Sequence, residues 1–132
     1  MKQTLGKEER LKSRKLIDKL YQEGTVIKSF PLRMVYLQTA HTSKFPCQVG
    51  VSVSKRNFKL AVDRNRMKRL LRETYRKQKN IVYDGAVLPH IFMITFIDKK
   101  LNDYSAIEHQ MKKILTLFAD QIKNTTKDET NN

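Results

Sequence analysis

The residues with the clearest chemical potential are the cations of the stretch 63–76, DRNRMKRLLRETYR. Its basic residues recur three or four positions apart, so a helix would align many of them on one face. Guanidinium groups bind phosphates through paired hydrogen bonds and stack on nucleobases. Like charges at this spacing repel each other, which argues against a merely solvated helix face. The stretch therefore predicts a surface for a polyanion, with nucleic acid favoured over a membrane.

The other reactive residue types form no recognisable catalytic or metal site. His41, His90 and His109 fall on a loop, a strand start and a helix, without the spacing of zinc ligands. Cys47 is the single cysteine, so no disulfide can form within the chain. The carboxylates of 98–108 lack the paired spacing of a metal-dependent nuclease. We therefore expect no catalytic and no metal-binding residues, so a partner must carry out any chemistry.

The charge of the whole chain points in the same direction. The 132 residues fit one domain, and 27 Lys and Arg against 13 Asp and Glu give a net charge of +14. Self-repulsion of this size disfavours a compact fold unless a polyanion neutralises it. The first residues contain no apolar segment like that of a signal peptide, and the apolar run at 91–97 has the length of a strand. We expect a cytoplasmic protein with a nucleic-acid partner and no membrane contact.

The periodicity of apolar residues predicts the elements that must position these cations. In chain order the elements are a helix at 8–23 closed by Gly24, a strand broken before Pro31, a strand at 32–39, a loop at 40–46, a strand at 47–54, a helix at 60–78, a turn-rich connection, a strand at 91–97 and a helix at 103–123. Such an order is typical of a single-domain α+β sandwich over 1–123. The polar tail 124–132 is expected to be disordered.

Two segments of this pattern resemble the bacterial ribonuclease P protein component. They are SVSK at 52–55 and AVDRNRMKRLLRETYR at 61–76, and the opening RLKSRK with Tyr21 and Gly24 is also similar. The resemblance spans about 8–123. It implies a two-layer sandwich of order α-β-β-β-α-β-α, like a domain of a small-subunit ribosomal protein. It also implies a left-handed crossover, whereas general chirality rules would suggest a right-handed one.

The resemblance also implies a function. The chain would be the protein subunit of ribonuclease P, an endoribonuclease that removes the 5′ leader of precursor tRNA. Ribonuclease P RNA would perform the chemistry, using Mg²⁺ held mainly by that RNA, and no obligate protein partner would be needed. The implied contacts with the catalytic RNA are Arg64, Asn65, Arg66, Lys68, Arg69 and Arg72. The implied leader-binding cleft, between the first helix and the sheet, contains Ile17, Tyr21, Tyr36, Ser52, Ser54, Lys55 and Arg56.

Two features depart from the family pattern, and alternatives remain. Ile17 replaces the usual aromatic residue, and the loop at 56–61 lacks the usual glycine and is one residue longer. Tyr21 and Tyr36 could be tyrosines at the edge of the core instead of platforms for stacked bases. A structural RNA-binding protein of ribosomal or chaperone type would show the same basic helix without needing a stacking groove. A DNA-binding regulator ranks lower, because no helix-turn-helix pair is recognisable.

Overall fold

The computed structural model describes residue 6 and residues 9–41, 47–83 and 88–131. The elements are α1 (Arg14–Glu23), β1 (Thr25–Ser29), β2 (Leu32–Gln38), β3 (Cys47–Val53), α2 (Ala61–Gln78), α3 (Asn80–Tyr83), β4 (His90–Phe96) and α4 (Tyr104–Asn131). The predicted α+β class and element order are confirmed, with the short helix α3 added in the connection before β4.

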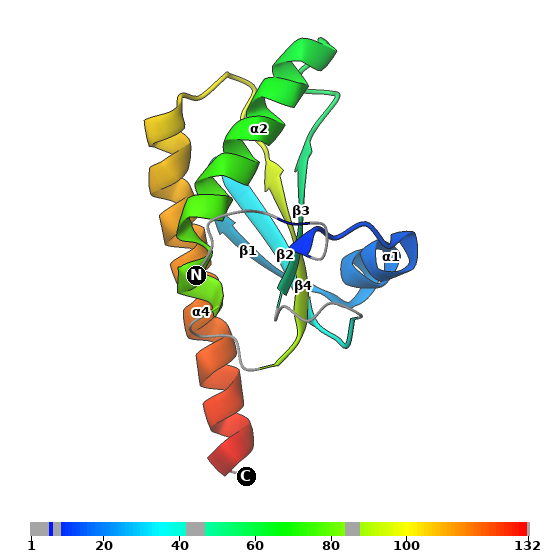
Figure 1. Ribbon diagram of the computed structural model, residues 1–132, viewed down its shortest axis with the longest axis vertical. Coiled ribbons are helices and arrows are strands. Elements are labelled where there is room, and N and C mark those ends of the chain that lie inside the picture. Colours follow the sequence, from blue (N-terminus) through cyan, green and yellow to red (C-terminus); the bar gives the residue numbers. More distant parts are fainter. Residues whose placement is uncertain (1–5, 7–8, 42–46, 84–87, 132) are drawn as a thin grey trace.

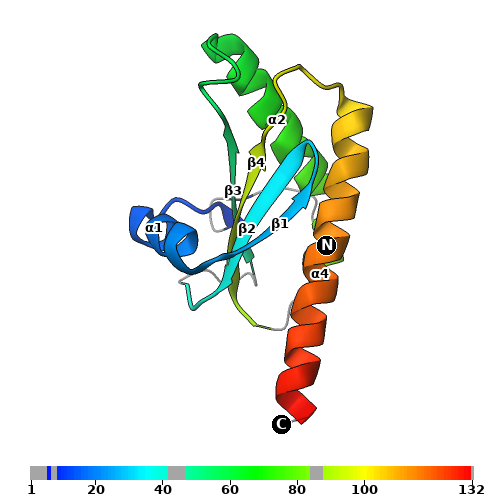
Figure 2. The same cartoon turned by 180° about the vertical axis from the view of Figure 1, so that it is seen from behind.

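The four strands form one sheet of order β1-β2-β4-β3. The pairs β1–β2 and β2–β4 are antiparallel, whereas β3 and β4 are parallel and joined through α2. Seen from the side of α2 with β3 and β4 pointing upward, β4 lies to the left of β3 (Figures 1 and 2). This crossover is therefore left-handed, an exception to the general rule.

The helices cover both faces of the sheet. Figure 1 shows α2 and α4 on one side and α1 on the other, and Figure 2 shows the same arrangement from behind. The larger core lies under α2 and α4 and includes Met67, Phe92 and Phe118. A smaller cluster under α1 joins Leu20 to Val35 and other residues of β2 and β4. Since β4 is buried on both faces over most of its length, its sequence is mainly apolar, with the run 91–94 at its centre.

Helix α1 begins later than the sequence predicts. Ser13 caps it by accepting a hydrogen bond from the Leu16 N–H at 3.3 Å, so the helix starts at Arg14 instead of residue 8. The preceding segment is extended, because Arg10 forms a parallel β-bridge with Val49 on the free edge of β3. Residues 10–12 therefore follow the edge of the sheet, although their sequence fits the periodicity of a helix.

Gly24 ends α1 as predicted, but the reason is close packing. Its backbone is extended, and its N–H donates to the Leu20 carbonyl at 2.8 Å. A Cβ at this position would lie 2.4 Å from that same carbonyl oxygen and 2.6 Å from Cγ1 of Val35. Only glycine fits where α1 turns directly into β1.

The last helix extends beyond its predicted end. The backbone of α4 is helical through Asn131, over most of the stretch 124–132 for which the sequence predicts a disordered tail. That stretch contains neither proline nor glycine, so its sequence includes no residue that strongly terminates a helix.

Candidate nucleic-acid interface

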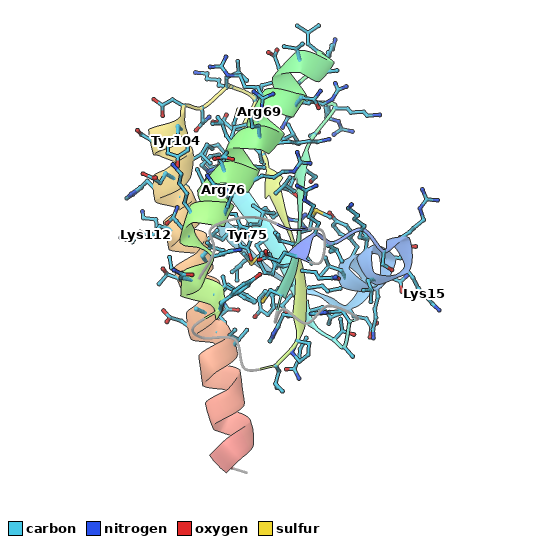
Figure 3. All side chains as sticks on the ribbon, in the orientation of Figure 1. Lys15, Arg69, Tyr75, Arg76, Tyr104 and Lys112 are labelled. Carbon is cyan, nitrogen blue, oxygen red and sulfur yellow. The ribbon has the colours of Figure 1, made fainter. Side chains whose placement is uncertain are left out.

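The packing of α2 determines which of its residues remain accessible. Met67, Leu71, Thr74 and Tyr75 are buried at helical spacing, and Tyr75 lies between the helix and the sheet in Figure 3. The Thr74 hydroxyl is satisfied within the helix, because it donates to the Leu70 carbonyl at 2.8 Å. The buried stripe turns the arginine-rich faces of α2 away from the core.

Four of the residues predicted to contact the catalytic RNA are exposed on this helix. They are Asn65, Arg66, Arg69 and Arg72, and Lys68 beside them is half-buried. Figure 3 shows Arg69 on the half of α2 that begins after β3. Arg64 is placed differently: its guanidinium donates to the carbonyls of Phe58 and Lys59 at 2.7 and 2.9 Å. Arg64 therefore closes the loop before α2 in addition to adding positive charge.

Two further cations of the stretch 55–79 are engaged by carboxylates. Arg76 donates to Glu73 at 2.8 Å, and this hydrogen bond lowers the pKa of the Glu73 carboxyl. Lys79 is buried against Glu9, with its Nζ 2.9 Å from one carboxylate oxygen. The exposed arginines of α2 that the proposed interface uses therefore lie between Arg66 and Arg72, and further exposed cations lie on the loop before the helix.

The loop at 54–60 is held in place although it departs from the family pattern. Phe58 is buried and stacks on Phe96, with ring centroids 5.9 Å apart. Asn57 Nδ2 donates to the Ile97 carbonyl at 3.3 Å. This anchoring leaves Lys55 and Arg56 exposed at the end of β3.

A polar row crosses the sheet on the face that α1 partly covers. The strand register aligns Lys28 with Arg33, Arg33 with Thr95, and Thr95 with Ser52. The hydroxyls of Ser52 and Thr95 are hydrogen-bonded at 2.8 Å. Arg33 and Thr95 each lie two residues from an apolar residue under α1, Val35 and Met93, so their side chains point to the same face of the sheet. Ser52 thus lies at the end of a row whose other end carries two cations. The alternation of β1 and β2 could have identified Lys28 and Arg33, which the sequence analysis missed.

The predicted leader-binding aromatics do not share one cleft. Ile17 and Tyr21 lie on α1, where Ile17 packs against the smaller core and Tyr21 is 50% exposed. Tyr36 lies on the opposite face of the sheet: its ring meets Phe118 of α4 edge-on at 4.9 Å, and its hydroxyl donates to Gln121. The predicted placement of Tyr36 beside α1 is therefore wrong, whereas a role for its half-exposed ring in RNA binding stays a prediction.

The titratable residues that could do chemistry are buried or separated in the described part of the chain. No three His, Cys, Asp or Glu side chains of that part form a group able to hold a metal ion. Burial raises the pKa of the Cys47 thiol to about 12. Burial also lowers the pKa of His90, whose Nδ1 lies 2.7 Å from the Leu88 carbonyl. Within the described residues, no helix is both long and apolar enough to cross a membrane.

Comparison with known proteins agrees with the resemblance to ribonuclease P protein components seen in the sequence. A family model described as Ribonuclease P matches residues 5–119. A ribonuclease P protein component of Porphyromonas gingivalis is 37% identical over 122 residues, which cover 89% of this chain and 88% of the relative. One from Chlorobaculum tepidum is 29% identical over 116 residues, or 76% of this chain and 75% of the relative.

Solved structures agree in fold. The RNase P protein of Staphylococcus aureus superposes with a TM-score of 0.66 at 20% identity, over 83% of this chain and 94% of that protein. The RNase P protein of Thermotoga maritima gives a TM-score of 0.67 at 18% identity, over 82% of this chain and 96% of that protein. With the family match spanning nearly the whole domain, the chain belongs to the family of ribonuclease P protein components.

Proposed function

We propose that this chain is the protein subunit of a ribonuclease P holoenzyme. In this proposal it binds ribonuclease P RNA and the 5′ leader of precursor tRNA, and it assists the endonucleolytic removal of that leader. The RNA subunit performs the cleavage, and the protein is a folded, basic platform. Its site of action would be the cytoplasm.

The observation that carries the proposal is the exposed cationic face of α2. Arg66, Arg69 and Arg72 are exposed there, and the cations of this region that meet carboxylates lie further along the chain. Guanidinium groups suit phosphate because each can donate two parallel hydrogen bonds to it. We assign this face to ribonuclease P RNA.

The leader is assigned to the sheet face on the side of α1. Lys28, Arg33 and Ser52 form a row across it, and Lys55 and Arg56 extend the charge beyond β3. This row of cationic and small polar side chains suits the phosphate backbone of single-stranded RNA. The exposed ring of Tyr21 suits a stacked base. Tyr36 lies on the other face of the sheet, so it would contact RNA only where the RNA passes around the edge of the sheet.

Magnesium enters the proposal through the RNA. The described residues of this chain bring no three His, Cys, Asp or Glu side chains together, so they do not fit a resident Mg²⁺ site built from such side chains. When bound by the RNA, Mg²⁺ would activate the attacking water and stabilise the leaving oxygen. The protein's contribution is to lower the repulsion between the two RNA molecules, which reduces the Mg²⁺ concentration they need.

Reconstitution with the cognate ribonuclease P RNA tests the proposal. Cleavage of precursor tRNA is measured at low Mg²⁺ with the RNA alone, the protein alone and both together. We expect no cleavage by the protein alone and faster cleavage by the pair than by the RNA alone. Unchanged cleavage on adding the protein would contradict the proposal, and so would cleavage by the protein without RNA.

A comparison of substrates separates this function from that of a structural RNA-binding protein. The protein should raise the affinity of the holoenzyme for leader-bearing precursor more than its affinity for mature tRNA. Equal effects on both RNAs would favour a general RNA-binding role, since the row on the sheet would then make no contact with the leader.

A further inference from the structure

Helix α1 has few packing contacts of its own. Of its ten residues only Leu20 is buried, and the smaller core that Leu20 joins is limited to short stretches of β2, β4 and the segment before α1. Figure 1 shows α1 on one side of the sheet and the long helices α2 and α4 on the other. A helix of this length is not stable by itself in water. The position of α1 therefore depends on what holds its two ends.

The end that begins α1 is connected to the edge of β3. The Leu11 N–H donates to the Val49 carbonyl at 2.9 Å, and Arg10 forms a β-bridge with the same residue. Leu11 is buried, whereas Arg10 and Lys12 on either side of it are exposed. A segment at the edge of a sheet with so few bonds separates readily from the fold unless a further contact holds it.

Glu9 provides that further contact. Its carboxylate is 3% exposed and accepts hydrogen bonds from Lys79 Nζ at 2.9 and 3.0 Å and from the Tyr83 hydroxyl. Lys79 directly follows α2, and Tyr83 is the last residue of α3. We call these three residues the Glu9 clamp. The clamp joins the segment before α1 to the end of α2, which belongs to the larger core.

The clamp protects the position of α1 more than it protects the fold as a whole. Without Glu9, the buried ammonium of Lys79 would face the segment 9–12 with no acid beside it, which is unfavourable. Water can reach Lys79 through unfolding of the domain, or through separation of 9–12 and α1 from the sheet. The separation exposes only the smaller core, so it requires less free energy than complete unfolding. Loss of the clamp should therefore release α1 first.

We infer that Glu9 is a positioning residue, which acts through the clamp to hold α1 and its exposed Tyr21 against the sheet. The inference rests on the proposed function, since it takes the α1 side of the sheet to bind the leader. Glu9 is buried and contacts no RNA itself, and none of the three clamp residues belongs to the sites predicted from the sequence. The clamp thus makes leader binding depend on a contact at the far end of α2.

Three variants of the full-length protein separate positioning from general stabilisation. Glu9→Met removes the acid and leaves Lys79 unpaired, whereas Glu9→Met with Lys79→Met removes both charges and closes the site with apolar side chains. Glu73→Gln is the matched control, because it removes one carboxylate from an ion pair that is exposed. All are compared well below the melting temperature of Glu9→Met.

Amide hydrogen exchange measures whether α1 opens. In Glu9→Met the amides of Leu20 and Tyr21 should exchange at least about tenfold faster relative to those of Ile114 and Leu115 in α4, because charge-assisted hydrogen bonds that hold α1 are lost. The double variant and Glu73→Gln should keep the natural ratio. A purely stabilising pair would instead change the exchange of α1 and α4 together, and that result would overturn the inference.

Binding measures whether the position of α1 matters for the leader. Holoenzymes are reconstituted with ribonuclease P RNA, and their affinities for precursor and mature tRNA are compared. In Glu9→Met the preference for the precursor should fall about tenfold, as expected for the loss of one stacked base, and the double variant should restore it. Affinity for ribonuclease P RNA, which we assign to α2, should not change. An unchanged preference in Glu9→Met, or a loss that the double variant does not restore, would overturn the inference.

Tyr83→Phe keeps the test decisive if Glu9→Met does not fold. This variant removes one hydrogen bond of the clamp and leaves the ion pair, so it should change both ratios in the same direction by a smaller factor, and no change in either would overturn the inference. The proposed function is tested separately with the unmodified protein. If that protein stimulates cleavage while the clamp variants behave like Glu73→Gln, only the positioning role is wrong; if it does not stimulate cleavage, the proposed function fails and the role of Glu9 in leader binding fails with it.

Discussion

Replacement of Glu9 by methionine would show how the segment before α1 is held. Glu9 and Lys79 are both 3% exposed and 2.9 Å apart, and they are 70 residues apart in the chain. Removing one partner of a buried ion pair typically costs about 3–5 kcal/mol, because the other charge stays buried without compensation. Domains are stable by only about 5–15 kcal/mol, so Glu9→Met should remove a large part of the stability.

A second ion pair of the same length provides the comparison. Arg76 and Glu73 are 2.8 Å apart, but their side chains are 27% and 45% exposed. Exposed pairs contribute about 0–1 kcal/mol, since water already solvates both charges. Glu73→Gln should therefore change the free energy of unfolding by less than about 1 kcal/mol, although the hydrogen bond of Glu73 is as short as that of Glu9.

Denaturation by urea and by heat measures both variants. We expect Glu9→Met to lower the melting temperature by about 10–15 °C, at roughly 3 °C per kcal/mol for a chain of this size. The double variant Glu9→Met, Lys79→Met should recover most of the loss, because an apolar pair of similar volume requires no desolvation of charge. A loss below about 1 kcal/mol for Glu9→Met, or no recovery in the double variant, would refute the reasoning that burial makes this pair important.

Three further predictions concern single residues. Gly24→Ala should destabilise the fold by about 1–3 kcal/mol in urea denaturation, because its Cβ would lie 2.4 Å from the Leu20 carbonyl oxygen; an unchanged midpoint would show that α1 shifts freely. Tyr36→Ala should leave the preference for leader-bearing over mature tRNA unchanged, because Tyr36 packs on Phe118 on the face opposite α1; a selective loss of binding to leader-bearing tRNA would show that the leader reaches this face. The buried thiol of Cys47, whose pKa is raised to about 12, should react with a thiol reagent at pH 8 only after denaturation; rapid reaction of the native protein would contradict its burial.

The exposed face of α2 could be predicted because it depends on local periodicity. Buried and cationic positions of one helix alternate with a period that the sequence displays directly, and Met67 and Leu71 are buried as that period requires. The strands were also predictable, since the limits of β2 and β4 differ from the predicted ones by at most one residue at each end.

The position of Tyr36 could not be predicted in the same way. Strand β2 carries apolar residues on both faces, so alternation assigns Tyr36 and Val35 to opposite sides without saying which side α1 covers. That choice depends on the packing of helices distant in the chain. The pairing of Arg10 with Val49 was missed for a similar reason, because two residues so far apart in the chain leave no periodic signal.

The central claim is that the exposed arginines of α2 contact ribonuclease P RNA, and the salt dependence of binding tests it most directly. Affinity for that RNA is measured at several salt concentrations for the natural protein, for the double variant Arg66→Ala, Arg69→Ala, and for Arg76→Ala as a matched control. Each lost phosphate contact should lower the slope of log affinity against log salt by about one, so the double variant should lose about two while the control keeps the natural slope. An unchanged slope in the double variant would contradict the claim.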